Sequence, residues 1–121
     1  MAHHSLLTPQ KVVNHLADLG KDLDITVNAL QSAELDAVRK RHAANLAESK
    51  AFVEAEGSMD LRKHEARLSA GDLEGDALVA EALVRHLRAT IRAIETRIDI
   101  GRSYGATVRA ELAMMPYTEN Q

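Results

Sequence analysis

An unbroken three-four spacing of apolar and small residues dominates the C-terminal third of this chain. From residue 77 to residue 115 they follow one another at alternating intervals of three and four. They are Ala77, Ala80, Val84, Leu87, Ile91, Ile94, Ile98, Gly101, Gly105, Val108, Leu112 and Met115. This spacing places them along one side of an α-helix, as in the contact stripe of a coiled coil. The sequence therefore predicts a helix over residues 76–115, about 60 Å long at 1.5 Å per residue.

Capping residues and glycines divide the rest of the chain into further helices. Thr8 followed by Pro9 predicts a helix start, and Gly20 predicts its end, with an uninterrupted or kinked helix as the alternative. Gly57 and Ser58 predict the next junction. The expected helices span 9–20, 22–56, 58–70 and 76–115, in a single domain over 8–115, with a flexible N-terminus at 1–7 and a polar tail at 116–121.

The apolar face of the expected helix over 22–56 combines large aliphatic residues with alanines. The aliphatic residues at roughly helical spacing are Leu23, Val27, Leu30, Val38, Leu46 and Val53. The alanines on the same expected face are Ala33, Ala37, Ala43, Ala47 and Ala51. So many alanines favour a close approach of the neighbouring helix over deep interdigitation of side chains.

Composition narrows the fold class, because 45% of the residues are hydrophobic but only 2% are aromatic. Such a chain suits helices that pack closely along their lengths. The expected fold is all-α: a long antiparallel helical hairpin with a coiled-coil-like seam. Beside that seam lies a flank formed by Leu83, Ala93, Ile100, Tyr104 and Thr107. The apolar face is then wider than one hairpin covers, so the sequence predicts a homo-oligomeric helical bundle.

Two glycines, Gly101 and Gly105, lie on the predicted seam, where each costs about 1 kcal/mol relative to alanine inside a helix. The three-four phase continues through both, which favours a close contact that only a missing Cβ permits. A helix break at Gly101 is the alternative. The candidate close-packing and oligomer residues are Ile91, Ile94, Ile98, Ile100, Gly101, Tyr104, Gly105 and Val108.

A stripe of arginines flanks the other side of the seam. The candidate contacts to a partner or to phosphate are Arg85, Arg88, Arg92, Arg102 and Arg109. The run Arg39–Arg41 is a second basic cluster that a hairpin brings toward this stripe. A solvated charged face is the simpler interpretation, and direct nucleic-acid binding is the alternative. The net charge of −3 and the scarcity of stacking aromatic residues count against nucleic acid.

The sequence lacks the patterns that catalysis or metal binding require. It contains no cysteine, which excludes disulfides, thiolate zinc sites and a cysteine nucleophile. No histidine occurs in a Glu-x-x-His or His-Glu-x-x-His arrangement, and no glycine-rich phosphate loop is present. We therefore expect neither an enzyme nor a metal or cofactor site. The chain also lacks an apolar run long enough to span a membrane and a signal-peptide pattern, so a cytoplasmic location is expected.

Two segments, AFVEAEGSMDLRKHEARL (51–68) and ALVRHLRATIRAIETRIDIGRSYGATVRAE (82–111), resemble small uncharacterised helical proteins encoded by tailed bacteriophages, particularly phages of actinobacteria. The similarity extends from about Leu16 to Glu111. It implies a phage origin and action in the host cytoplasm, and it supplies no catalytic residue.

The expected function is that of a phage accessory or adaptor protein that binds a host or phage protein. The alternative is a nucleic-acid-binding helper of phage replication or recombination. Within the first resembling segment, Arg62 is expected to stabilise the helix junction, or else to face a partner.

Overall fold

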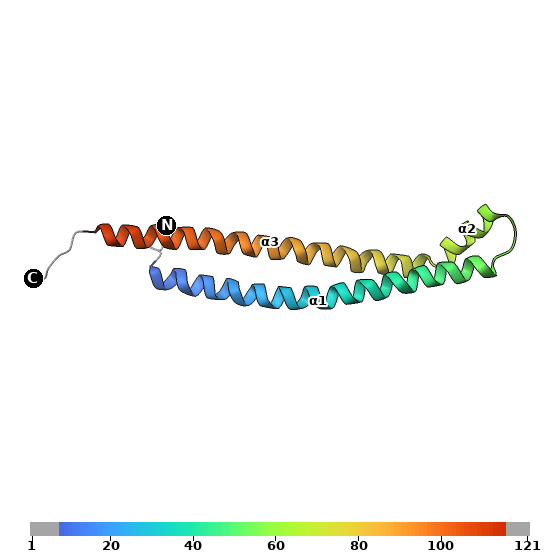
Figure 1. Ribbon diagram of the computed structural model, residues 1–121, viewed down its shortest axis with the longest axis horizontal. Helices are drawn as coiled ribbons and strands as arrows, with labels where there is room; N and C mark the ends of the chain where they lie inside the picture. Colours follow the sequence, from blue (N-terminus) through green and yellow to red (C-terminus); the bar gives the residue numbers. More distant parts are fainter. Residues whose placement is uncertain (1–7, 116–121) are drawn as a thin grey trace, which may run out of the picture. The chain divides into compact units, whose positions relative to one another are not determined.

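The computed structural model describes residues 8–115, which form three α-helices and, within that range, no strand. They are α1 (Pro9–Glu54), α2 (Met59–Ser69) and α3 (Gly71–Met114) (Figure 1). The all-α prediction is confirmed. The flexible N-terminus and the polar tail predicted at 1–7 and 116–121 lie outside the described residues.

The start of α1 has the predicted cap. The Oγ1 atom of Thr8 accepts a hydrogen bond from the Lys11 backbone N–H at 3.2 Å, and Pro9 is the first helical residue. Proline is suited to this position because the first N–H groups of a helix have no partner within the helix.

The predicted helix break at Gly20 is absent, because α1 runs from Pro9 through Gly20 to Glu54 without interruption. Unlike Gly57, Gly20 has a negative φ, so its backbone conformation is compatible with the interior of a helix. Leu19 is buried and Leu23 half-buried on either side of it. The packing of these leucines outweighs the cost of about 1 kcal/mol of a glycine inside a helix.

The junction between α1 and α2 follows the prediction. Gly57 has a φ of +108°, a backbone conformation that residues with a Cβ rarely adopt. Ser58 is the N-cap of α2, with its Oγ accepting a hydrogen bond from the Leu61 backbone N–H at 3.3 Å. Asp60 lies in the first turn of α2, where a negative charge is favourable.

The α2–α3 junction is tighter than predicted. Only Ala70 separates the two helices, and its backbone N–H donates to the carbonyl of Ala66 at 3.0 Å. The last helix therefore begins at Gly71 and not at residue 76. Asp72 and Glu74 lie in its first turn, where they stabilise the helix N-terminus, so residues 71–75 belong to the helix.

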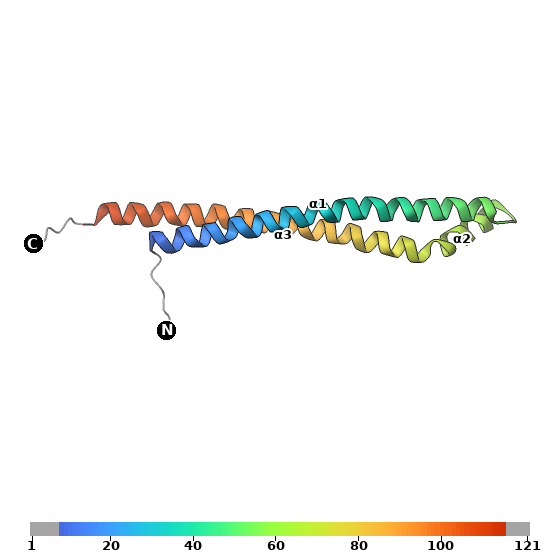
Figure 2. The ribbon, with the colours of Figure 1, turned by 90° about the horizontal axis from the view of Figure 1, so that it is seen from below.

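The chain divides into two compact units, whereas a single domain is expected from its length. The terminal unit consists of the described parts of Met1–Thr26 and Thr90–Gln121, and the central unit is Val27–Ala89. In each unit a stretch of α1 lies beside a stretch of α3 that runs in the opposite direction (Figures 1 and 2). Two units arise because each turn of such long helices contacts only the turns opposite to it.

Alanines line the inside of the central unit. Ala33 and Ala37 on α1 pack with Ala80 and Val84 on α3 to form its core cluster. Ala44, Ala66, Ala70 and Ala77 are also buried, at 3% exposure or less. The predicted inward positions of Val38, Ala43, Leu46 and Val53 are wrong, since these side chains are exposed. Ala33, Ala37 and Ala44 point inward because their small side chains permit α1 to approach α3 closely.

Larger side chains fill the terminal unit. Val12, Leu19 and Ile94 are buried there. Along α3 burial follows the predicted three-four spacing as far as Val108, but Leu112 and Met115 are exposed. Gly105 lies against Val12, near the start of α1, so no turn of α1 remains to cover Leu112.

Candidate functional site

The two predicted stripe glycines are points of close contact between α1 and α3. A Cβ atom built on Gly101 would lie 2.8 Å from the Cδ2 atom of Leu16. A Cβ atom built on Gly105 would lie 3.0 Å from the Cγ1 atom of Val12. The helix does not break at Gly101, because α3 continues to Met114. The close-contact interpretation of the glycines is therefore confirmed.

The eight candidate seam residues separate into two groups. Six are buried or half-buried within α3: Ile91, Ile94, Ile98, Gly101, Gly105 and Val108. The other two, Ile100 and Tyr104, are 60% and 52% exposed. They line a groove of about 400 Å³ in the terminal unit, together with Lys11, His15 and Arg97 from α1 and α3. The groove therefore combines the exposed side chains of Ile100 and Tyr104 with three basic side chains.

The predicted arginine stripe does not form one site. All five arginines are exposed on α3, but Arg85 and Arg88 belong to the central unit, whereas Arg92, Arg102 and Arg109 belong to the terminal unit.

The arginines of the terminal unit have no ion pair with any residue between 8 and 115. Arg102 and Arg109 line a small groove of about 200 Å³ beside Val13 and Gly105. Ile100 and Tyr104 do not line this groove, and the two arginines do not line the groove of Ile100. Arg102 and Arg109 therefore lie outside the groove that Ile100 and Tyr104 line.

Two arginines of the central unit, Arg88 and Arg41, are paired with carboxylates. Arg88 Nη2 donates to a carboxylate oxygen of Glu34 at 2.6 Å. Arg41 lines a groove of about 620 Å³ with Arg85 and Arg88, so of the second basic cluster the structure places Arg41 beside the stripe, whereas Arg39 and Lys40 do not line this groove. Glu34 and Glu81 line the same groove, which reduces its attraction for phosphate.

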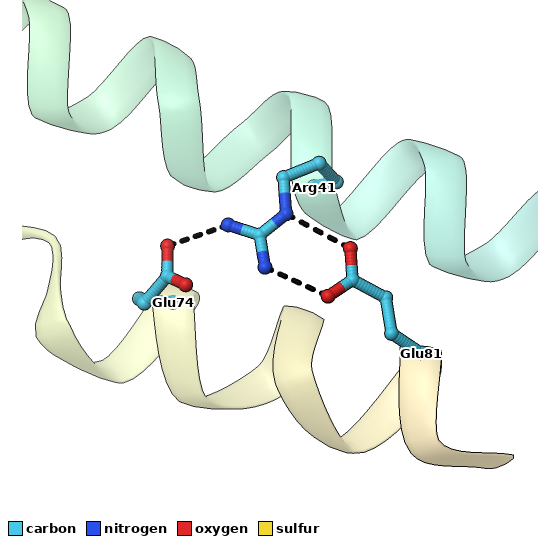
Figure 3. Close-up of polar contacts among 3 residues, drawn as sticks. All are labelled: Arg41, Glu74 and Glu81. Atoms are coloured by element: carbon cyan, nitrogen blue, oxygen red, sulfur yellow. Dashed lines mark hydrogen bonds and ion pairs between the residues drawn. The ribbon is translucent and has the colours of Figure 1, made fainter. Parts of the chain in front are cut away.

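Arg41 is held by two glutamates of α3 (Figure 3). Its Nε and Nη2 atoms donate to the two carboxylate oxygens of Glu81, each at 2.9 Å, and its Nη1 atom donates to Glu74 at 2.6 Å. The hydrogen bonds from Arg41 lower the pKa of Glu81, and the two glutamates raise the pKa of Arg41 further above its ordinary value. The guanidinium therefore connects α1 to α3 and is not free for a ligand.

Replacing Arg41 by Gln is expected to lower the thermal unfolding midpoint by a few degrees at pH 7. Because the pKa of Glu81 is lowered in the fold, its contribution to stability is present above the unfolded pKa of about 4.3 and is lost as the pH falls through the folded pKa. The difference in thermal unfolding midpoint between the wild type and the Arg41→Gln variant should therefore shrink as the pH falls from 5 to 3. Circular dichroism melts test this, with exposed Arg39→Gln as the control. A difference independent of pH would contradict the assignment.

Arg62 has the expected structural role at the first junction. Its Nη2 atom donates to the backbone carbonyl of Phe52 at 3.2 Å, and its guanidinium lies 4.5 Å from the centre of the Phe52 ring. A cation there satisfies a carbonyl in the last turn of α1 and is attracted by the helix dipole.

Several residues around the grooves are not among the predicted site residues. Lys11 and His15 lie near the start of α1, where the sequence signals described above are the helix caps. Lys11, His15, Asp18 and Asp22 follow one another at intervals of four, three and four residues, and this spacing is the signal that identifies them as one face of α1. Glu74 and Glu81 lie two helical turns apart on α3. Both can accept hydrogen bonds from one guanidinium only because α1 brings Arg41 beside α3.

Within residues 8–115, the structure brings no three histidine, aspartate or glutamate side chains together as metal ligands. In the same range, no helix is both long and apolar enough to cross a membrane. No protein-family model, no curated protein and no solved structure matches this chain.

Proposed function

We propose that this chain is a non-enzymatic accessory or adaptor protein that acts through helix-mediated protein–protein contacts. The observation that carries this proposal is the exposed apolar surface of the terminal unit, where Ile100 and Tyr104 are more than half exposed beside a groove. Covering the exposed half of one such side chain with a partner contributes about 1 kcal/mol. The surface is therefore suited to a protein partner.

The helix pairs provide a rigid support for that surface. In the terminal unit, Leu16 opposite Gly101 and Val12 opposite Gly105 repeat at four-residue intervals on helices of opposite direction. We propose that these contacts form an antiparallel coiled-coil seam and that copies of the chain assemble into a helical bundle. The resemblance of the sequence to phage proteins supports a phage origin, action in the host cytoplasm and a host or phage protein as partner.

Nucleic-acid binding is the second candidate function. It is favoured by Arg92, Arg102 and Arg109, which carry charge in the terminal unit without an ion pair inside the described chain. Such a surface would bind phosphates without sequence preference, and its affinity would fall steeply with salt. In the central unit the balance of arginines and glutamates does not support this function.

Light scattering on a sizing column, with and without single- and double-stranded oligonucleotides at low salt, distinguishes the two functions. With the chain loaded at 200 μM or more, we expect an average mass above that of one 13.2 kDa chain and no change on adding either oligonucleotide. A mass shift that disappears at moderate salt, and in the Arg92→Ala, Arg102→Ala, Arg109→Ala triple variant, would establish nucleic-acid binding instead. A monomer that ignores both oligonucleotides would contradict the oligomeric bundle.

A further inference from the structure

Seven exposed side chains of the terminal unit form one continuous surface, which we call the Ile100 flank. They are Lys11, His15, Asp18 and Asp22 on α1, and Arg97, Ile100 and Tyr104 on α3. Five of the seven line the groove described above. The two aspartates continue the α1 stripe at helical spacing, so they lie on the same face as Lys11 and His15.

The order of charges along the α1 stripe is the first evidence for the occupant. Two basic residues, Lys11 and His15, are followed by two acidic ones, Asp18 and Asp22. None of the four has an ion pair with another residue in the described range. A stripe with basic and acidic halves is complementary to itself when a second copy runs in the opposite direction.

The position of the glycine contact is the second evidence. The midpoint of the α1 stripe lies between His15 and Asp18, next to Leu16, which contacts Gly101 on α3. A two-fold axis that lies in the flank and runs across both helices therefore passes the midpoint of the charged stripe on α1 and the position of Ile100 on α3. The charge pattern of α1 and the apolar centre of α3 thus share a single symmetry axis.

We infer that a second copy of this chain covers the Ile100 flank through a two-fold axis at this point. Lys11 then faces Asp22 of the second copy, and His15 faces Asp18. On α3 the two Ile100 side chains meet at the axis, and Arg97 stacks on Tyr104 of the second copy as a cation–π contact. Each copy contributes the same contacts, as an isologous interface requires.

The size of the surface sets the expected strength. The α1 stripe spans about 17 Å at 1.5 Å per residue, and two packed helices are about 20 Å wide. The dimer would therefore bury roughly 700 Å² in total, which is below the range of stable permanent interfaces. We therefore expect a weak, reversible dimer. This inference rests on the proposed self-association and specifies the face that mediates it.

A mixing experiment with two charge-reversal variants tests the interface. In a dimer of the Lys11→Asp variant, the new aspartate of each copy faces Asp22 of the other copy, so two acidic side chains meet. In a dimer of the Asp22→Lys variant, the new lysine faces Lys11, so two basic side chains meet. Each variant alone should therefore dimerise at least tenfold more weakly than wild type. An equimolar mixture restores both pairs, so it should form a heterodimer within about threefold of the wild-type affinity. Sedimentation velocity from 1 to 200 μM, with one variant fluorescently labelled, measures both.

The matched control is the pair Lys21→Asp and Asp24→Lys, which reverses the same charges at exposed positions of α1 off the flank. Neither variant nor their mixture should change the dimer affinity. Circular dichroism verifies the helix content of every variant. The four positions are exposed, so a variant is expected to keep its fold.

The outcomes separate this inference from the proposed function. A wild-type chain that self-associates, with single variants as strong as wild type or a mixture that does not recover, would overturn the Ile100 flank as the interface and leave self-association intact. A wild-type chain that stays monomeric up to 200 μM would overturn both. As an independent measurement, Ile100→Cys in this cysteine-free chain should form a covalent dimer on mild oxidation, whereas Asp24→Cys should not.

Discussion

Replacing Gly101 and Gly105 together by leucine is expected to lower the free energy of unfolding by about 2–4 kcal/mol. Each added side chain would enter a space already occupied, by Leu16 at the first position and by Val12 at the second. Overpacking of this kind costs about 1–3 kcal/mol per site or more, and leucine recovers only about 0.8 kcal/mol per site through its better helix propensity. Urea unfolding monitored by circular dichroism measures the change.

The same substitution at Gly20 is the control. Gly20 lies inside α1, and a Cβ atom built there meets nothing within 4 Å. Gly20→Leu should therefore raise the free energy of unfolding by about 0.5–1 kcal/mol through helix propensity alone. Stabilisation by all three leucines would show that Gly101 and Gly105 face solvent, against the structure.

Replacing Ala77 by leucine is expected to destabilise the central unit by about 2–3 kcal/mol. The side chain of Ala77 is fully buried at 0% exposure, in a unit whose interior is built from alanines. Three more carbon atoms cannot be accommodated unless α3 moves away from its neighbours, and that movement would also separate Arg41 from Glu81. Urea unfolding, with hydrogen exchange to locate the loss in residues 27–89, tests the prediction.

Ala82→Leu is the matched control, because Ala82 lies five residues further along α3 and is exposed. The Ala→Leu substitution changes the helix propensity by the same amount at both positions, so the comparison isolates the effect of packing. Equal stabilities of the two variants would mean that α1 and α3 do not approach each other closely at Ala77.

Much of the candidate site follows from local patterns. The three-four spacing predicts which α3 residues are buried up to Val108, and it places Ile100 and Tyr104 on a flank. The cap residues Thr8 and Ser58, and the turn at Gly57, also follow from neighbouring residues alone. These features are local because each depends on the backbone geometry of a few consecutive residues.

Other features depend on residues far apart in the chain. Val38 and Leu46 match a helical spacing as well as the alanines do, and hydrophobicity alone favours burying them. Ala33 and Ala37 of α1 are buried because they pack with Ala80 and Val84 of α3, and small side chains on both helices permit the closer contact. Ion pairing also depends on the opposite helix. Arg88 of the stripe pairs with Glu34 on α1, and Arg41 of the second basic cluster pairs with Glu81 on α3.

The sequence by itself determined the all-helical class, the glycine turn and caps of the α1–α2 junction, and the buried spacing of α3, because hydrogen bonding and periodicity along one helix decide these. Only the tertiary structure decided that α1 crosses Gly20, which face of α1 is buried, which arginines remain unpaired, and that Lys11 and His15 lie beside Ile100. The physical reason is that burial and ion pairing are properties of two helices together, and the sequence of either helix contains only half of each contact.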